Sequence, residues 1–177
     1  MTREDMKRFF ALEINFSSIG LEQVGEMEPC FCTPVGSEWV GSIGCDGISF
    51  VLLPGDERVF CVDPAMGEPG SYVLPVAKDF RTFLSYILFC RNTNPISQIW
   101  WMDEKRFRQL LAEDAQESWP GCKEYFAEQE QAMEKIKNTF GVVPTDPYAP
   151  VKEIQRDFDP GSLVFSDEYY DVLGLEH

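Results

Sequence analysis

Two cysteines separated by one residue, Cys30 and Cys32, have the spacing in this sequence that is best suited to thiolate chemistry. Together with Cys45 and Cys61 they could supply four thiolates to a structural zinc ion. Structural zinc sites usually contain paired C-x-x-C knuckles, however, and the sequence has no second cysteine pair. Free cysteine is also among the residue types that are buried most often. We therefore predict that Cys30 and Cys32 bind no metal and serve as small core side chains.

The same prediction extends to the other cysteines, because nothing in the sequence indicates an oxidising compartment. The first eight residues are highly charged and do not resemble a secretory signal, and no apolar run is long enough to span a membrane. We therefore expect a cytoplasmic protein without disulfides. Its six cysteines are Cys30, Cys32, Cys45, Cys61, Cys90 and Cys122.

Histidine is nearly absent from the chain, and this excludes several kinds of active site. His177 is the one histidine, and with Leu175 and Glu176 it resembles the start of a hexahistidine tail, so we expect residues 175–177 to derive from an expression vector. Without histidine, the chain cannot build a Ser-His-Asp or Cys-His nucleophile system. It also cannot build a zinc site that requires imidazole.

Carboxylates are the remaining groups that could perform acid–base chemistry. The adjacent pairs Asp56–Glu57 and Asp167–Glu168 both lie in turn-like contexts, and with thirty acids in the chain such neighbours arise by chance. A glycosidase that uses carboxylates alone would need two acids across a cleft, and no pattern in the sequence places them so. We therefore predict that the protein is not an enzyme and has no catalytic residues.

A glycine-dense stretch is the one candidate for a cofactor loop. A phosphate-binding loop would need a lysine and a Ser or Thr at the start of a helix. The residues that follow Gly47 instead enter a predicted strand, so we expect turn glycines and no cofactor. The glycines are Gly36, Gly41, Gly44 and Gly47.

Charge is the strongest compositional signal. The 177 residues contain 30 acids and 15 bases, which gives a formal net charge of −15. Such a chain repels nucleic acids and anionic membranes, and it attracts basic proteins. Between Phe9 and Ala77 ten acids accompany the single base Arg58, so this half is either a docking face for a cationic protein or a means of solubility. The ten are Glu13, Glu22, Glu26, Glu28, Glu38, Asp46, Asp56, Glu57, Asp63 and Glu68.

Short strands separated by turn signals occupy the first half of the chain. An Asp-Gly turn at residues 45–47 and a Pro-Gly turn at 54–57 predict consecutive hairpins, hence an antiparallel meander. The predicted strands are residues 39–43, 48–53, 59–62 and 72–74.

Helical periodicity dominates the second half. Asp79 is a predicted N-cap for a helix with apolar residues at positions 80, 83, 84, 87 and 88, and Asp103 caps another. A longer helix over residues 120–140 is expected to pack Phe126 and Ile136 on the sheet, while residues 164–170 are expected to be extended. Shorter helices are predicted at residues 4–10, 96–101 and 151–158. The fold class is therefore α+β, one domain over residues 1–174 in which helices cover an antiparallel meander.

Several strings in this order resemble the SUKH superfamily, which joins bacterial immunity proteins to fungal regulators of cell-wall glucan synthesis. They are GCDGI at residues 44–48, YVLPVA at 72–77, DFRTFL at 79–84, and QIWW at 98–101 followed by Phe107. The resemblance implies an α+β fold and a binding role without catalytic residues. Its bacterial members neutralise toxins, often nucleases, by direct contact.

The leading functional hypothesis is therefore a non-enzymatic immunity protein that binds a basic toxin through its acidic surface. Steering between opposite charges would speed that association. The alternative is a regulatory scaffold similar to the fungal glucan synthesis regulators.

Overall fold

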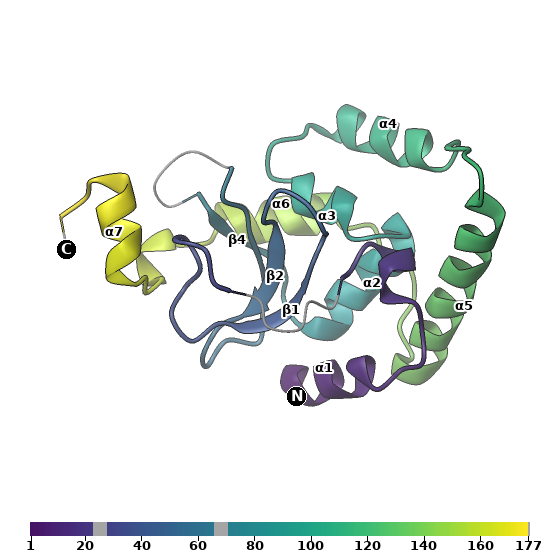
Figure 1. Ribbon diagram of the computed structural model, residues 1–177, viewed down its shortest axis with the longest axis horizontal. Helices are drawn as coiled ribbons and strands as arrows, with labels where there is room; N and C mark the ends of the chain where they lie inside the picture. The colour runs from purple at the N-terminus through teal and green to yellow at the C-terminus, as the bar shows by residue number, and fades with distance from the viewer. Residues whose placement is uncertain (23–27, 66–70, 177) are drawn as a thin grey trace.

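A four-stranded antiparallel sheet forms the centre of the computed structural model, which describes residues 1–22, 28–65 and 71–176 (Figure 1). The strands pair in chain order, so the predicted meander and the α+β class are confirmed. The strands are β1 (Glu38–Ser42), β2 (Ser49–Leu52), β3 (Val59–Val62) and β4 (Val73–Ala77).

The turn between β1 and β2 explains why the first hairpin was readable from sequence. Asp46 and Gly47 both have positive φ values, 55° and 70°, and the Ile48 amide donates a hydrogen bond to the Cys45 carbonyl at 3.2 Å. This is the turn geometry whose twist matches that of the flanking strands, and Asp-Gly is among the pairs that adopt it most readily.

Both faces of the sheet are buried, because successive residues of β2 and β3 contribute to different cores. Phe50 pairs with Cys61 and points to the first core, whereas Val51 pairs with Phe60 and points to the second. This alternation follows from the two-residue period of a strand.

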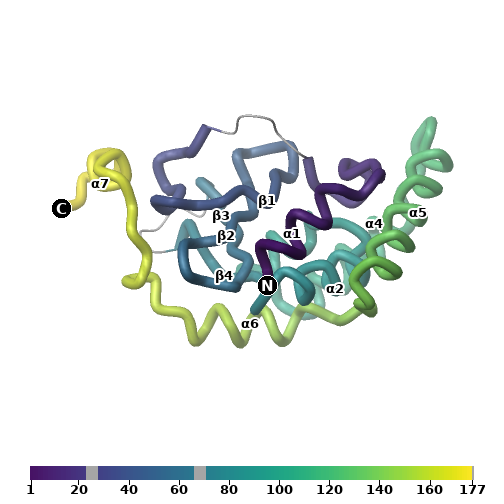
Figure 2. The backbone as a smooth tube through the Cα atoms, turned by 90° about the horizontal axis from the view of Figure 1, so that it is seen from below, coloured from purple at the N-terminus to yellow at the C-terminus, as the bar shows by residue number. Residues whose placement is uncertain are grey.

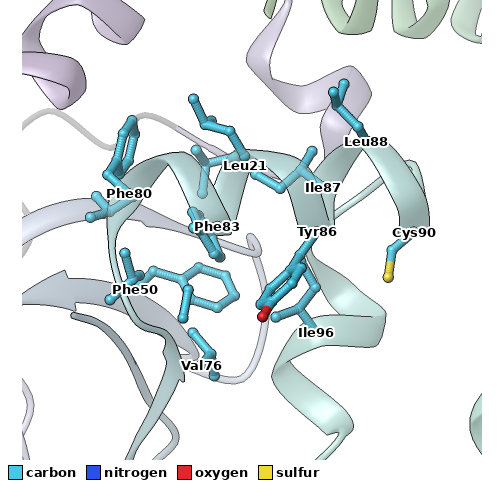
Figure 3. Close-up of a cluster of buried hydrophobic side chains, with 14 of the residues drawn as sticks. Leu21, Phe50, Val76, Phe80, Phe83, Tyr86, Ile87, Leu88, Cys90 and Ile96 are labelled. Atoms are coloured by element: carbon cyan, nitrogen blue, oxygen red, sulfur yellow. The ribbon is translucent and has the colours of Figure 1, made fainter. Parts of the chain in front are cut away.

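Helix α2 (Phe80–Cys90) covers the first face. Asp79 caps it as predicted, accepting a hydrogen bond from the Thr82 amide at 2.7 Å. The Phe83 ring packs on the Phe50 ring with centroids 4.9 Å apart (Figure 3). Helices α1 (Thr2–Phe10), α3 (Asn94–Gln98) and α4 (Glu104–Asp114) complete this side of the core. Helix α3 begins before the predicted residue 96, because Pro95 occupies its first turn, where a missing N–H costs nothing.

Helix α5 (Cys122–Phe140) packs against α2 and the short turn η1 (Phe16–Ile19), so its predicted position on the sheet is wrong. Ile136 is fully buried there, but Phe126 is only half-buried. The reason is that α2 already occupies the first face, which leaves α5 to form an outer layer at one end of the molecule (Figures 1 and 2).

Residues 158–173 close the second face, whereas Val151 before them still belongs to the first core. Helix α6 (Tyr148–Arg156) packs against β4, and the chain continues through η2 (Pro160–Ser162) to α7 (Asp167–Leu173) at the opposite end from α5 (Figure 2). The predicted extended run is wrong at Tyr169 and Tyr170, which are helical. Tyr169 and Leu173 are spaced four residues apart, so one side of α7 reaches the second core, where the Tyr169 ring stacks on that of Phe165, just before the helix.

An ion pair between a buried carboxylate on α1 and a half-exposed arginine on α2 joins the two helices. The Asp5 side chain is 6% exposed, and its carboxylate accepts hydrogen bonds from Arg81 Nε at 2.7 Å and Nη2 at 3.1 Å. The hydrogen bond from Arg81 holds the pKa of Asp5 below its ordinary value. The pair therefore stabilises the fold at neutral pH, and this contribution is lost as the pH falls through the lowered pKa.

We expect Asp5→Asn to lower the free energy of unfolding at neutral pH by about 1–2 kcal/mol, a range reduced because Arg81 stays half-exposed. Urea denaturation between neutral and acidic pH measures this, and the difference between wild type and variant should shrink on acidification. Glu4→Gln, an exposed position on the same helix, is the control and should change stability little. A constant difference at every pH would contradict the role of the charge.

Candidate functional site

A pocket between α4 and α5 combines acidic and aromatic side chains. Its volume is ≈ 280 Å³, and the end of α2 contributes to its wall. Small-molecule sites usually measure ~300–1,000 Å³, so this cavity suits a single side chain better than a whole metabolite. The residues that give it chemical character are Asp114, Glu117, Trp119, Tyr125 and Phe126.

Three rings form the aromatic part of this pocket. The Trp119 centroid lies 5.4 Å from that of Tyr125 and 5.6 Å from that of Phe126, and the Tyr125 and Phe126 centroids are also 5.6 Å apart. Gly121, at φ 90°, is the N-cap of α5, and the Cys122 amide donates a hydrogen bond to the Trp119 carbonyl at 3.1 Å, which holds Trp119 beside the start of α5. Trp119 remains 39% exposed, which leaves ring surface open to a guest.

The carboxylates of the pocket occupy an unfavourable position. The C-terminus of a helix carries partial negative charge, yet α4 ends in Glu113 and Asp114 with no base in its last turn. Glu113 pairs with Arg106 at 3.3 Å, but within the described residues neither Asp114 nor Glu117 forms an ion pair. Burial and the nearby Glu117 charge raise the pKa of Asp114. The site therefore carries negative charge that a cation would relieve.

Arg91, which lines the pocket, already has partners. Arg91 Nε donates to Gln129 Oε1 at 3.0 Å, and its guanidinium also pairs with Glu130. The carboxylates and aromatic rings of the pocket can therefore bind a second cation in addition to Arg91. Aromatic faces attract guanidinium and ammonium groups within about 6 Å, and a carboxylate adds a charge-assisted hydrogen bond.

Much of the acidic half predicted as a docking face is paired within the chain. Glu38 bonds Arg3 at 2.6 Å, Asp56 bonds Arg58 at 2.7 Å, and Glu57 accepts a hydrogen bond from the Thr2 amide at 2.8 Å. Asp63 is buried and accepts a hydrogen bond from the Ala65 amide. The exposed remainder in the described residues is Glu13, Glu22, Glu28 and Asp46, while Glu26 and Glu68 lie outside the described residues.

The cysteines do not assemble as a four-thiolate site. Cys61 is buried in the first core, and Cys45 is exposed on the hairpin turn, where the prediction of burial is wrong because a turn offers no core. Cys30 and Cys122 are half-buried, and Cys32 and Cys90 are buried. In residues 1–22, 28–65 and 71–176, no three His, Cys, Asp or Glu side chains gather as a metal site would require.

The other sequence candidates are also placed apart. Asp56 and Glu57 contact different partners, while Asp167 and Glu168 are exposed in the first turn of α7, where the helix dipole favours acids. Gly44 and Gly47 lie in the loop that leads into β2, as expected for turn glycines. For Gly41 this prediction is wrong, because Gly41 lies within β1 at an irregularity in its pairing with β2, where Leu21 leaves no room for a side chain.

Sequence reasoning missed the acidic and aromatic pocket, because its residues lie in the half where charge signs are mixed. A signal is nevertheless present. Asp114, Glu117, Trp119 and Pro120 form an acidic and aromatic connection between two amphipathic helices, and such connections lie on the surface and often carry function.

Within the described residues, none of the helices has the length and apolar character that crossing a bilayer requires. Comparisons of the chain with protein-family models, curated proteins and solved structures find no match. The resemblance to the SUKH superfamily therefore depends on the sequence motifs alone, and what it implies for function stays a prediction.

Proposed function

We propose that this protein binds a basic protein partner and receives one of the partner's arginine side chains in the pocket between α4 and α5. The observation that carries the proposal is that Asp114 and Glu117, which form no ion pair within the described residues, line the same pocket as the partly exposed Trp119 ring. A guanidinium can stack on such a ring and bond a carboxylate at the same time, which an ammonium does less well.

The charge of the whole chain supports the same kind of partner. A net charge of −15 attracts basic proteins over about one Debye length, ~8 Å at physiological salt, and so raises the association rate. The exposed acids Glu13, Glu22, Glu28 and Asp46 add to this field, while the pocket would fix the orientation.

The motifs similar to the SUKH superfamily suggest a toxin as that partner. A nuclease toxin must be basic where it grips phosphates. The protein then acts as an immunity protein that occupies the basic surface, without performing catalysis itself.

The test compares two variants in which carboxylates are replaced by neutral amides. Asp114→Asn combined with Glu117→Gln removes the pocket charge, and Glu124→Gln removes an exposed charge on α5 outside the pocket. The partner is first co-purified from the native host and identified, and its affinity is then measured by titration. We expect the double variant to weaken binding roughly ten- to a hundredfold, because the loss of one charge-assisted hydrogen bond to the guanidinium costs about 1.5–3 kcal/mol. The control should bind nearly as well as wild type.

Stability measurements separate binding from folding. Because the pKa of Asp114 is raised, its ionised form is disfavoured in the folded state at neutral pH. Asp114→Asn should therefore leave the melting temperature unchanged or raise it. An acidic partner, or equal loss of affinity in the Glu124→Gln control, would contradict the proposal.

A further inference from the structure

Cys30 and Cys32 lie together in a tight turn on the second face of the sheet. The Thr33 amide donates a hydrogen bond to the Cys30 carbonyl at 2.9 Å, and the Cys30 amide donates one to Thr33 Oγ1 at 3.0 Å. These bonds fix the backbone so that the two sulfur atoms are 3.4 Å apart. Both cysteines are free thiols in this structure.

The two thiols differ in access to solvent. Cys30 is half-buried and lines a cavity of ≈ 210 Å³ together with Trp39 and Ser166. Cys32 is 0% exposed and belongs to the second core beside the sheet. A reagent in the cavity can therefore reach Cys30 first, whereas Cys32 is reached only from Cys30.

The hydrogen bonds around the pair also distinguish the two sulfurs. The pKa of Cys30 falls to about 6, chiefly because the Cys32 thiol donates a hydrogen bond to it and secondarily because the Thr33 hydroxyl, 3.2 Å away, does the same. The pKa of Cys32 is raised, because it holds the proton that it shares with Cys30 and is buried. Cys30 is therefore the sulfur that ionises more easily, and Cys32 is the one that holds its proton more tightly.

We propose that Cys30 and Cys32 form a thiol–disulfide exchange site for small-molecule disulfides, in which Cys30 attacks and Cys32 completes an intramolecular bond. The Cys30 thiolate attacks one sulfur of the small disulfide, whose S–S bond breaks and releases one thiolate. Cys32 then loses its proton and attacks the Cys30 sulfur, which releases the second thiolate. Two protein thiols are oxidised to one disulfide, the small disulfide is reduced to two thiols, and the two protons go to the released sulfurs.

The geometry favours a bond that reverses easily. The sulfurs must approach from 3.4 Å to about 2.05 Å, the length of a disulfide bond. A ring closed across one intervening residue, Phe31, restricts the disulfide dihedral, and strained disulfides are reduced more readily than relaxed ones. The site is therefore suited to a reversible switch and poorly suited to a permanent cross-link.

Intact-mass measurement with glutathione disulfide as the probe tests the reaction. The full chain carries Cys45→Ser and Cys122→Ser, which remove the exposed thiol and the half-buried thiol outside the turn. We expect the mass to fall by two hydrogen atoms and to return on addition of dithiothreitol. Adding Cys32→Ser should instead trap one glutathione on Cys30, and adding Cys30→Ser should abolish both products. A stable glutathione adduct without Cys32→Ser, or no reaction at all, would overturn the proposal.

The pH dependence of Cys30 alkylation is a second test, and it does not require an oxidant. The alkylation rate of Cys30 by iodoacetamide should have its midpoint at pH about 6. Cys32→Ala, which removes the donor, should move the midpoint toward the value of an ordinary thiol, and Cys32→Ser, which keeps a hydroxyl, should move it less. An alkylation midpoint at the pH of an ordinary thiol, with both cysteines present, would contradict the proposal. Stoichiometric zinc in the purified protein would also contradict it, together with the prediction that the pair binds no metal.

Discussion

Phe83→Ala should lower the free energy of unfolding by about 3–5 kcal/mol, the usual range for a fully buried phenylalanine. The side chain is 0% exposed and lies where α2 meets the sheet, against Phe50 at 4.9 Å and Phe80 at 6.3 Å between ring centroids (Figure 3). Its removal leaves a cavity that neither a rigid helix nor a paired strand can fill. Urea denaturation with an unchanged slope would measure the loss.

Phe126→Ala is the matched control for this prediction. The sequence pattern places Phe126 on the sheet, which would give it the same large effect, but the structure places it half-buried beside Trp119 at 5.6 Å. We expect its loss to be less than half that of Phe83→Ala. Equal losses would mean that α5 is as central to the core as α2, contrary to the structure.

Gln129→Leu should have the second largest effect, about 3 kcal/mol. The side chain is 2% exposed, and its Nε2 donates to the carbonyls of Ser18 at 2.9 Å and Arg91 at 3.0 Å. Its Oε1 accepts from Arg91 Nε at 3.0 Å. Leucine has a similar volume but leaves these groups without partners, and each buried unsatisfied group costs about 1–3 kcal/mol.

Gln131→Leu lies two residues further along the same helix on an exposed surface and serves as the control. It should change the free energy of unfolding by less than about 0.5 kcal/mol. Thermal and urea unfolding of both variants measure the difference. If Gln129→Leu is as stable as the control, the hydrogen bonds between α5, η1 and the end of α2 do not hold these elements together.

The elements that the sequence predicts correctly are those specified by neighbouring residues. The Asp46–Gly47 turn, the Asp79 cap and the Asp103 cap each depend on residues within one turn of the chain, and all three are confirmed. The position of α5 depends instead on distant residues, because α2 occupies the face of the sheet on which α5 was expected to pack. Periodicity identifies the apolar face of a helix, but it does not identify the surface on which that face packs.

The candidate pocket was not predictable for a related reason. Its charge looks ordinary in sequence, because Arg106 and Glu113 seem to balance their neighbours. Only the structure shows that these two residues pair with each other, which leaves Asp114 and Glu117 next to the exposed ring of Trp119. In the acidic half the sequence overestimates the free charge. Glu38 and Asp56 look unpaired in sequence, but in the structure they form ion pairs with arginines.

The two faces of the sheet become covered at different times as the chain is synthesised. The strands and α2 lie within residues 38–90, so the core around Phe50 and Phe83 can form early from nearby residues. The opposite face is completed only by Phe158, whose ring packs on Phe60, and by Tyr169, whose ring packs on Phe31 and Tyr72. At ~5–20 residues per second the ribosome needs seconds to make the intervening chain, and Phe60 stays partly uncovered meanwhile. The nascent chain is therefore open to aggregation or chaperone capture through that face, so truncations before α7 should lower the soluble yield in cells more than their effect on the finished fold suggests.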